Sequence, residues 1–317
     1  MGEAQLRVVE VPGAIQLSRE QVCLSEGGFA ALELTVPDDF GRPGARRQVL
    51  LNDGESYALF TVAALLPGDG PGEASVAMGD PDRLFAGSAP SATVVAMTDV
   101  FAAEQLVETV TTSGDVAVIA PHGGAIERHT DEQAATVAAD LRLDVDLWAC
   151  LGRGTDQFRR LHITSDDISE HSFPGFRALL QREHRCAVSF HGFNRATKPG
   201  TTTALDLIVG GQFDLDRRYD LADRIRHQLP PEAAFEVYVT TSCRDPLSGL
   251  SPRNAVNRLA SSRGIQIEQS GRLRRSPDAP RLVAEAVVEA LLVWDVSTNM
   301  SARQLPNATD PVDRRRG

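Results

Sequence analysis

Two histidines and two glutamates are placed in the sequence where they could form a hydrolytic metal centre. His122 and Glu127 flank the tetrapeptide Gly-Gly-Ala-Ile, and His191 and Glu268 each follow a short apolar run. Two imidazoles and one carboxylate are typical protein ligands of a catalytic zinc ion, which keeps its fourth position for water. A second carboxylate can act as general base for that water. The residue types therefore predict a zinc site made by His122, Glu127 and His191, with Glu268 as the base.

Short buried strands are the elements that would position these residues. Residues 116–120 form an uninterrupted apolar run that is too short for a typical helix, which indicates a strand covered on both faces of a parallel sheet. Pro121 ends this strand because it has no N–H group for the ladder, and Gly123 allows a sharp turn. The apolar run 186–190 ends at His191 in the same way. We therefore expect both histidines at one edge of the sheet, where open α/β sheets bind ligands.

Residues 93–296 show strands alternating with helices, the pattern of an α/β domain. We expect further strands at residues 147–150, 161–164, 205–209, 235–239 and 265–268, and helices at residues 101–110, 131–142, 173–184, 219–229, 254–261 and 280–294. A capping box formed by Thr130 and Gln133 opens the helix 131–142, whose buried stripe includes Leu141. These elements predict a mixed, mostly parallel open sheet flanked by helices.

Residues 1–92 have a different pattern, with strand-like alternation and little helical periodicity. The expected strands are residues 6–11 and 31–36 and a hairpin made by residues 47–51 and 56–62. Asp53-Gly54 supplies the positive φ that the hairpin turn needs. We expect a small β-rich, barrel-like domain here, joined to a catalytic domain at 93–296 by the small-residue segment 86–92. The polar residues 297–317 are expected to be a disordered tail.

Composition and charge narrow the classes of function. The net charge of -11 provides no basic surface for phosphate backbones, so nucleic acid is not expected as a partner. The four cysteines are dispersed without CxxC spacing, which indicates reduced thiols rather than a disulfide framework. The chain shows no basic region followed by an apolar run at its start and no apolar stretch of membrane-spanning length. We therefore expect a cytoplasmic protein without a membrane partner.

The same residues also allow simpler interpretations. His122 with its two glycines is also typical of an ordinary turn, and a glutamate at a strand end, such as Glu268, is often only solvated. His162 lies in Leu161-His-Ile-Thr-Ser165, also near an expected strand end. For His162 we favour a supporting or packed position beside the metal ligands over ligation itself.

Six short segments occur together in an order that resembles the motif series of a known family. They are Pro121-His-Gly-Gly-Ala-Ile-Glu127, Leu161-His-Ile-Thr-Ser165, Ser189-Phe-His-Gly192, Val209-Gly-Gly211, Asn254-Ala-Val-Asn-Arg258 and Gly264-Ile-Gln-Ile-Glu268. The series is similar to that of zinc-dependent poly-γ-glutamate hydrolases, a family with phage and bacterial members that resembles zinc carboxypeptidases in fold. The resemblance covers roughly residues 95–295 and leaves the N-terminal domain outside.

The resemblance implies that His122, Glu127 and His191 hold one zinc ion and that Glu268 is the general base. The reaction it implies is hydrolysis of γ-glutamyl amide bonds, above all in poly-γ-glutamate, in which the base takes a proton from water and returns it to the leaving amine. Two alternatives stay open: a zinc amidase or peptidase for another γ-glutamyl or cell-wall peptide, and a module that binds metal or ligand without turnover. The presence of Glu268 argues against the second, because a binding site needs no base.

Several polar residues are candidates for binding an acidic substrate. Asn254 and Arg258 are one helical turn apart, so they share a face and could bind a carboxylate, with Asn257 of the same segment beside them. The alternative is that Arg258 pairs with a structural acid. A net acidic enzyme gains no long-range steering toward a polyanion, so we also expect a local basic groove. Its candidates are Arg153, Arg159, Arg160, Arg195 and Lys198, the last two directly after the His191 motif.

Overall fold

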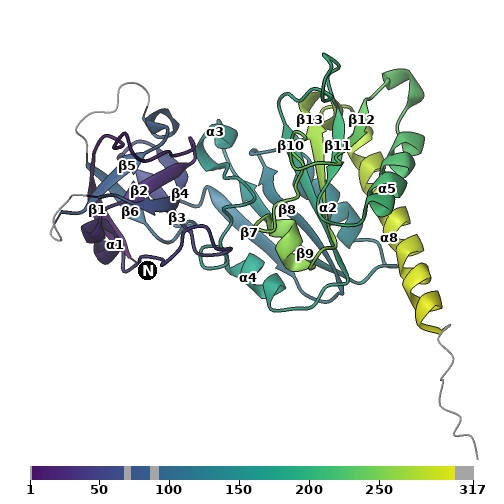
Figure 1. The fold of residues 1–317 in the computed structure, drawn as a ribbon, viewed down its shortest axis with the longest axis horizontal. Helices are drawn as coiled ribbons and strands as arrows, with labels where there is room; N and C mark the ends of the chain where they lie inside the picture. The colour runs from purple at the N-terminus through teal and green to yellow at the C-terminus, as the bar shows by residue number, and fades with distance from the viewer. Residues whose placement is uncertain (1, 68–72, 86–92, 304–317) are drawn as a thin grey trace, which may run out of the picture.

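The computed structural model describes residues 2–67, 73–85 and 93–303, which form a closed six-stranded barrel and a seven-stranded sheet with helices (Figure 1). The barrel strands, in the order β1-β5-β2-β4-β3-β6, are β1 (Glu3–Val8), β2 (Gln21–Leu24), β3 (Arg47–Asn52), β4 (Tyr57–Leu65), β5 (Ser75–Met78) and β6 (Thr93–Met97). Inward side chains such as Leu51, Phe60 and Val76 fill its core. The barrel also carries the helix α1 (Glu26–Ala31) and the 3-10 turn η1 (Pro81–Arg83).

The barrel confirms the predicted hairpin and corrects two other predictions. β3 and β4 pair antiparallel, with Arg47 opposite Val62 at one end and Asn52 opposite Tyr57 at the other, as the Asp-Gly turn predicts. The strand expected at residues 31–36 is wrong, because Ala31 is the last residue of α1 and residues 32–36 form no strand. The N-cap of this helix is Ser25, whose side chain accepts a hydrogen bond from the Gly28 N–H. β6 belongs to the barrel although it lies beyond the expected boundary at residue 92, and the expected linker 86–92 lies outside the described residues.

The second sheet is mixed and mostly parallel, with the strand order β12-β11-β13-β10-β8-β9-β7. Its strands are β7 (Leu106–Thr111), β8 (Val116–Gly124), β9 (Val145–Gly152), β10 (Cys186–Phe193), β11 (Leu207–Gly210), β12 (Val237–Val239) and β13 (Gly264–Ser270). β13, β10, β8 and β9 are parallel neighbours, whereas β7 pairs antiparallel with β9 and β11 pairs antiparallel with β13. The carboxyl ends of the central strands therefore meet at one edge.

Helices cover both faces of this sheet because successive side chains of its strands point to opposite faces, and the side chains on both faces are apolar. Val116 and Val118 of β8 pack into one core with the helices α2 (Thr130–Ala138), α5 (Leu215–Gln228) and α8 (Ala279–Arg303). Ala117 and Ile119 face the opposite core, which contains the helices α4 (Pro174–Leu180) and α6 (Ala255–Leu259). Figure 1 shows α5 and α8 on the side of the sheet away from the barrel. The remaining short elements are α3 (Gln157–Leu161), η2 (Pro231–Ala233) and α7 (Gly271–Arg274).

Four expectations for this region are corrected. The helix expected at residues 101–110 is wrong, because the β-branched run at its end forms edge strand β7. The strand expected at 161–164 is wrong, since α3 ends at Leu161 and no strand follows there. Helix α2 ends at Ala138, which leaves Leu141 fully exposed, and Thr130 donates its side-chain hydrogen bond to the Glu127 carbonyl rather than capping the helix. Helix α8 extends to Arg303, into the expected tail, whose residues 304–317 lie outside the described residues.

The barrel packs against the segment that follows α3. Leu50 and Leu59 of the barrel belong to the same core as Trp148 and Phe173 of the sheet region. Polar contacts join the two parts as well: Gln48 Nε2 donates to the Asp167 carbonyl over 2.6 Å. The barrel is thus fixed beside the chain that carries His162. None of the helices within residues 2–67, 73–85 and 93–303 is long and apolar enough to cross a lipid bilayer.

Candidate metal centre

The expectation that Pro121 ends the strand is wrong, because β8 continues to Gly124 and Pro121 lies at a bulge near its carboxyl end, next to His122. The register between β8 and β9 shifts between Ala120 and Gly123, where Pro121 has no N–H group for the ladder. Gly124 then adopts a φ of 63°, and a Cβ atom there would lie 2.5 Å from the Gly152 carbonyl oxygen, so this turn requires glycine. The His122 ring is held by the Ile163 carbonyl, 2.7 Å from Nε2.

Glu127 meets His122 from the turn after β8, and His191 meets it from β10. The Glu127 N–H donates to the His122 carbonyl over 2.7 Å, which closes the turn after β8. Glu127 Oε2 accepts the Gly192 N–H over 2.9 Å and lies 3.2 Å from His122 Nδ1. His191 Nδ1 lies 3.7 Å from the same oxygen. All three side chains are buried, and their candidate ligand atoms lie within 4.8 Å of one another, so they could hold one metal ion.

The electrostatics of His122 and Glu127 favour metal-binding protonation states. Burial lowers the pKa of His122. Burial alone would raise the pKa of Glu127, but the surrounding imidazoles, His122 first among them, lower it well below its ordinary value. A neutral imidazole and an ionised carboxylate are the forms in which these side chains bind metals. The donor set and its charges therefore fit a zinc ion.

Glu268 lies on β13 directly beside His191, which occupies the paired position on β10. Burial raises the pKa of Glu268 to about 7. Gln266 Nε2 donates to Glu268 Oε1 over 2.9 Å, and Asn254 Nδ2 in turn donates to Gln266 Oε1 over 2.7 Å. A carboxyl group that titrates near neutrality and has a fixed orientation can accept a proton and return it.

Arg274 is a nearby cation that sequence reasoning did not identify. Its guanidinium packs against Gly192, where a Cβ atom would lie 2.4 Å from Arg274 Cζ, so a larger residue after His191 would displace this guanidinium. The positive charge of Arg274 acts to lower the pKa of Glu268, against the stronger effect of burial. Arg274 therefore offsets part of the charge of the two glutamates, and no motif in the sequence indicated it.

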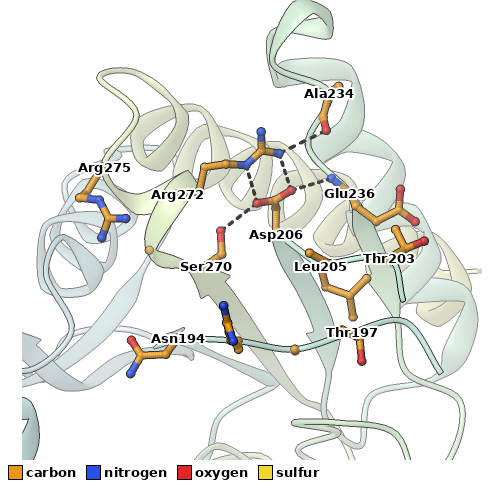
Figure 2. Close-up of a pocket in the computed structure, with 14 residues that line it drawn as sticks. Asn194, Thr197, Thr203, Leu205, Asp206, Ala234, Glu236, Ser270, Arg272 and Arg275 are labelled. Atoms are coloured by element: carbon orange, nitrogen blue, oxygen red, sulfur yellow. Dashed lines mark hydrogen bonds and ion pairs between the residues drawn. The ribbon is translucent and has the colours of Figure 1, made fainter. Parts of the chain in front are cut away.

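The four predicted residues line a cavity of about 550 Å³ that also contains His162, Asn254 and Gln266. Arg195 lines this cavity and a neighbouring one of about 860 Å³. In the second cavity Asp206 accepts two hydrogen bonds from Arg272, so the charge of that arginine is compensated (Figure 2). In the part of the chain that the structure describes, no acidic side chain lies within ion-pair distance of Arg195 or Arg275. The two cavities thus share a wall and carry two uncompensated arginines.

The other predicted substrate residues lie elsewhere. Arg258 pairs with Glu170 and donates to the Ile168 carbonyl over 2.7 Å, which is the structural pairing weighed as the alternative. Asn257 donates to the backbone of Gly249 and Ser251 and holds that loop. Lys198 is exposed and lies 3.2 Å from Glu236. None of these three side chains lines the metal cavity.

The expected basic groove is also smaller than predicted. Arg159 pairs with Asp156, and Arg160 contacts the Tyr57 carbonyl. Arg153 lines a separate hollow beside β7. Of the five candidates, only Arg195 lines the metal cavity, because the others are drawn to partners or surfaces on different elements.

His162 lies against the candidate metal ligands, in contact with a residue from the barrel. Its ring centroid is 4.3 Å from that of His122, and its Nε2 atom lies 3.4 Å from Glu127 Oε1. Its Nδ1 atom lies 2.6 Å from Oε1 of Glu20. Burial alone would lower the pKa of His162, but the two carboxylates raise it to about 9. Glu20 had no recognisable signal in the sequence, whereas Gln266 could have been found because it is two residues before Glu268 on the same strand face.

Comparison with known proteins identifies relatives of the region that contains this site. The sequence profile of the poly-gamma-glutamate hydrolase family matches residues 100–277. The protein YndL of Bacillus subtilis (strain 168), of the group UPF0714, is 32% identical over 166 residues, which are 52% of this chain and 57% of YndL. The matched region therefore spans little more than half of that relative.

Two solved structures are similar to part of the chain. A bacteriophage poly-gamma-glutamate hydrolase is 24% identical, with a TM-score of 0.49, over 61% of this chain and 91% of the phage chain. The zinc-free apo form of YndL is 24% identical, with a TM-score of 0.46, over 59% of this chain and 90% of that one.

Proposed function

Because the chain belongs to the poly-gamma-glutamate hydrolase family, we propose that it is a zinc-dependent hydrolase that cleaves γ-glutamyl amide bonds. The observation that carries the proposal is the convergence of His122 and Glu127, from the end of β8 and the turn after it, with His191 of β10, beside the buried carboxyl group of Glu268. Such a buried set of two imidazoles and two carboxyl groups is costly unless a cation compensates it. A purely structural cluster would have no need of Glu268.

Each residue of the centre has a role in this proposal. When bound, a zinc ion polarises the amide carbonyl and makes a water molecule more acidic. His122, His191 and Glu127 Oε2 provide the ligand atoms, and the Gly192 N–H fixes the carboxylate. Glu268 takes a proton from the attacking water and returns it to the nitrogen of the leaving amine. Its pKa of about 7 suits both transfers.

The substrate in this proposal is an acidic γ-glutamyl chain that extends from the metal cavity into the neighbouring cavity. Every γ-linked glutamyl residue carries a free carboxylate, which an arginine can bind through paired hydrogen bonds. Arg195 lies where the two cavities meet, and Arg275 lines the second one. Their uncompensated charges give this surface a local attraction for a polyanion in a chain of net charge -11. The catalytic region and the barrel form separate domains in this proposal, with the chemistry confined to the former.

Metal-dependent hydrolysis of a defined polymer tests this function. The purified protein is stripped with a chelator, reloaded with one equivalent of zinc, and incubated with γ-linked and α-linked polyglutamate of equal length. We expect zinc to restore cleavage of the γ-linked polymer only, seen as shortened chains and new amino groups. Zinc-loaded protein that leaves both the γ-linked polymer and short γ-glutamyl peptides intact would contradict the proposal.

A further inference from the structure

The barrel reaches the metal centre through a short chain of side chains. Glu20 Oε1 lies 2.6 Å from Nδ1 of His162, and Nε2 of that ring lies 3.4 Å from Glu127 Oε1. The two oxygens of Glu127 thus have different surroundings. Oε2 faces His122, His191 and the Gly192 N–H, whereas Oε1 faces His162. The orientation of the carboxylate therefore depends on where His162 is held.

Two barrel residues hold His162, one at its side chain and one at its backbone. Glu20 is anchored in the barrel because its carbonyl accepts the Thr61 N–H over 2.9 Å. The buried Arg83, whose guanidinium lies 5.1 Å above the Phe60 ring, donates to the His162 carbonyl over 2.7 Å. His162 is only 18% exposed and Glu20 only 15%, so water competes little for this hydrogen bond. These contacts are built into the domain interface and do not depend on mobile surface side chains.

We propose that Glu20 is a positioning residue of the metal centre, by which the barrel fixes His162 and, through it, the Glu127 carboxylate. The inference rests on the proposed zinc site. It gives the barrel a part in the active centre, although Glu20 lies outside residues 100–277, which match the family. Partners that orient metal ligands typically contribute 10- to 100-fold to metal affinity. Because Glu20 acts through one intermediate ring, we expect its effect at the lower end of that range.

A double-mutant cycle on zinc affinity tests this chain of contacts without any substrate. The wild type, Glu20→Ala, His162→Ala and the double variant are titrated with zinc alone against a chromophoric chelator. We expect Glu20→Ala to weaken zinc binding about 10-fold in the wild type, and to have no further effect when His162 is already alanine. Glu20→Gln keeps a hydrogen-bond acceptor and should recover most of the loss. If Glu20→Ala does not fold, Glu20→Met, which fills a similar volume but accepts no hydrogen bond, takes its place.

Two control variants separate positioning from general loosening of the interface. Arg46→Ala removes the ion pair of the barrel with Asp167 but touches neither Glu20 nor His162. Glu73→Ala removes a barrel glutamate that pairs with Arg7 at the surface. Both should bind zinc as the wild type does. The proposal is overturned if Glu20→Ala binds zinc like the wild type, if its loss persists in the His162→Ala background, or if Arg46→Ala loses as much affinity.

The outcomes also separate this inference from the proposed function. If the wild type binds zinc but cleaves no γ-glutamyl substrate, the proposed function is refuted. The double-mutant cycle on zinc affinity still tests the role of Glu20 in that case. If the wild type binds no zinc, the metal centre fails and the positioning role fails with it.

Discussion

Replacing Glu268 with glutamine should stabilise the metal-free fold and at the same time greatly slow hydrolysis. The carboxyl group is buried, and burial raises its pKa from 4.5 to about 7. At about 1.4 kcal/mol per pH unit, this shift corresponds to a cost of about 3 kcal/mol for keeping the ionised group in the fold. The amide of the variant has the same shape, and its oxygen still accepts the hydrogen bond from Gln266. Most of the cost should therefore disappear.

The pH dependence of this gain follows from the direction of the shift. Below pH 4.5 the carboxyl group is protonated in both the folded and the unfolded chain, so it costs nothing. Between pH 4.5 and about 7 only the unfolded chain ionises, and the stability of the wild type falls as pH rises. Above about pH 7 the full cost is present. Glu268→Gln should therefore raise the free energy of unfolding by about 3 kcal/mol at pH 8 and by less than about 1 kcal/mol at pH 5.

Urea unfolding at these two pH values, in the presence of a chelator, measures the stability difference. Zinc affinity and turnover of the γ-linked polymer are measured on the reloaded protein. We expect unchanged zinc affinity and a fall in kcat of about 100- to 10,000-fold, the usual contribution of a general base. The exposed Glu232→Gln is the matched control and should change neither quantity. Equal stability gains at pH 5 and pH 8, or retained turnover, would refute the assignment of Glu268.

Three further predictions concern the ligands, the fold and the substrate path. His191→Ala removes a proposed ligand and should weaken zinc binding, measured by chelator competition, by more than the 10- to 100-fold typical of a supporting residue; near-normal binding would contradict the site. Asp146→Ala leaves the buried Gly114 N–H and the His184 ring without their hydrogen-bond partner. It should lower the free energy of unfolding, measured in urea, by about 3 to 5 kcal/mol. A decrease below about 1 kcal/mol would argue against this network. Arg275→Gln should raise KM for long γ-linked chains but not for a γ-glutamyl dipeptide. Arg177→Gln, which lies outside both cavities, is the control and should change neither KM value. An equal change in KM for both substrates would exclude the proposed path of the polymer through the second cavity.

The local patterns of the sequence were sufficient to predict the mixed α/β fold and the three side chains that converge where a metal ion could bind. One apolar run of strand length stops at His122, and another stops at His191. In a parallel sheet the carboxyl ends of the strands lie at the same edge, so both side chains are expected at that edge whatever the order of the strands in the sheet. The glycine at position 124 is required by the local turn after β8, where its φ is 63°. These features depend on neighbours in the chain, which is why sequence reasoning could reach them.

Contacts between distant segments could not be obtained in this way. Arg258 has the spacing of a carboxylate-binding residue, yet the packing of α6 places it against Glu170. Residues 106–111 carry polar and apolar side chains that fit a helix or an edge strand, and pairing with β9 selects the strand. Glu20 reaches His162 only because the barrel docks beside α3. The sequence by itself thus determines which short elements form and which side chains lie at their ends. The packing of those elements against one another decides the partner of each charged side chain, because a charge pairs with whatever group the fold brings within a few ångströms.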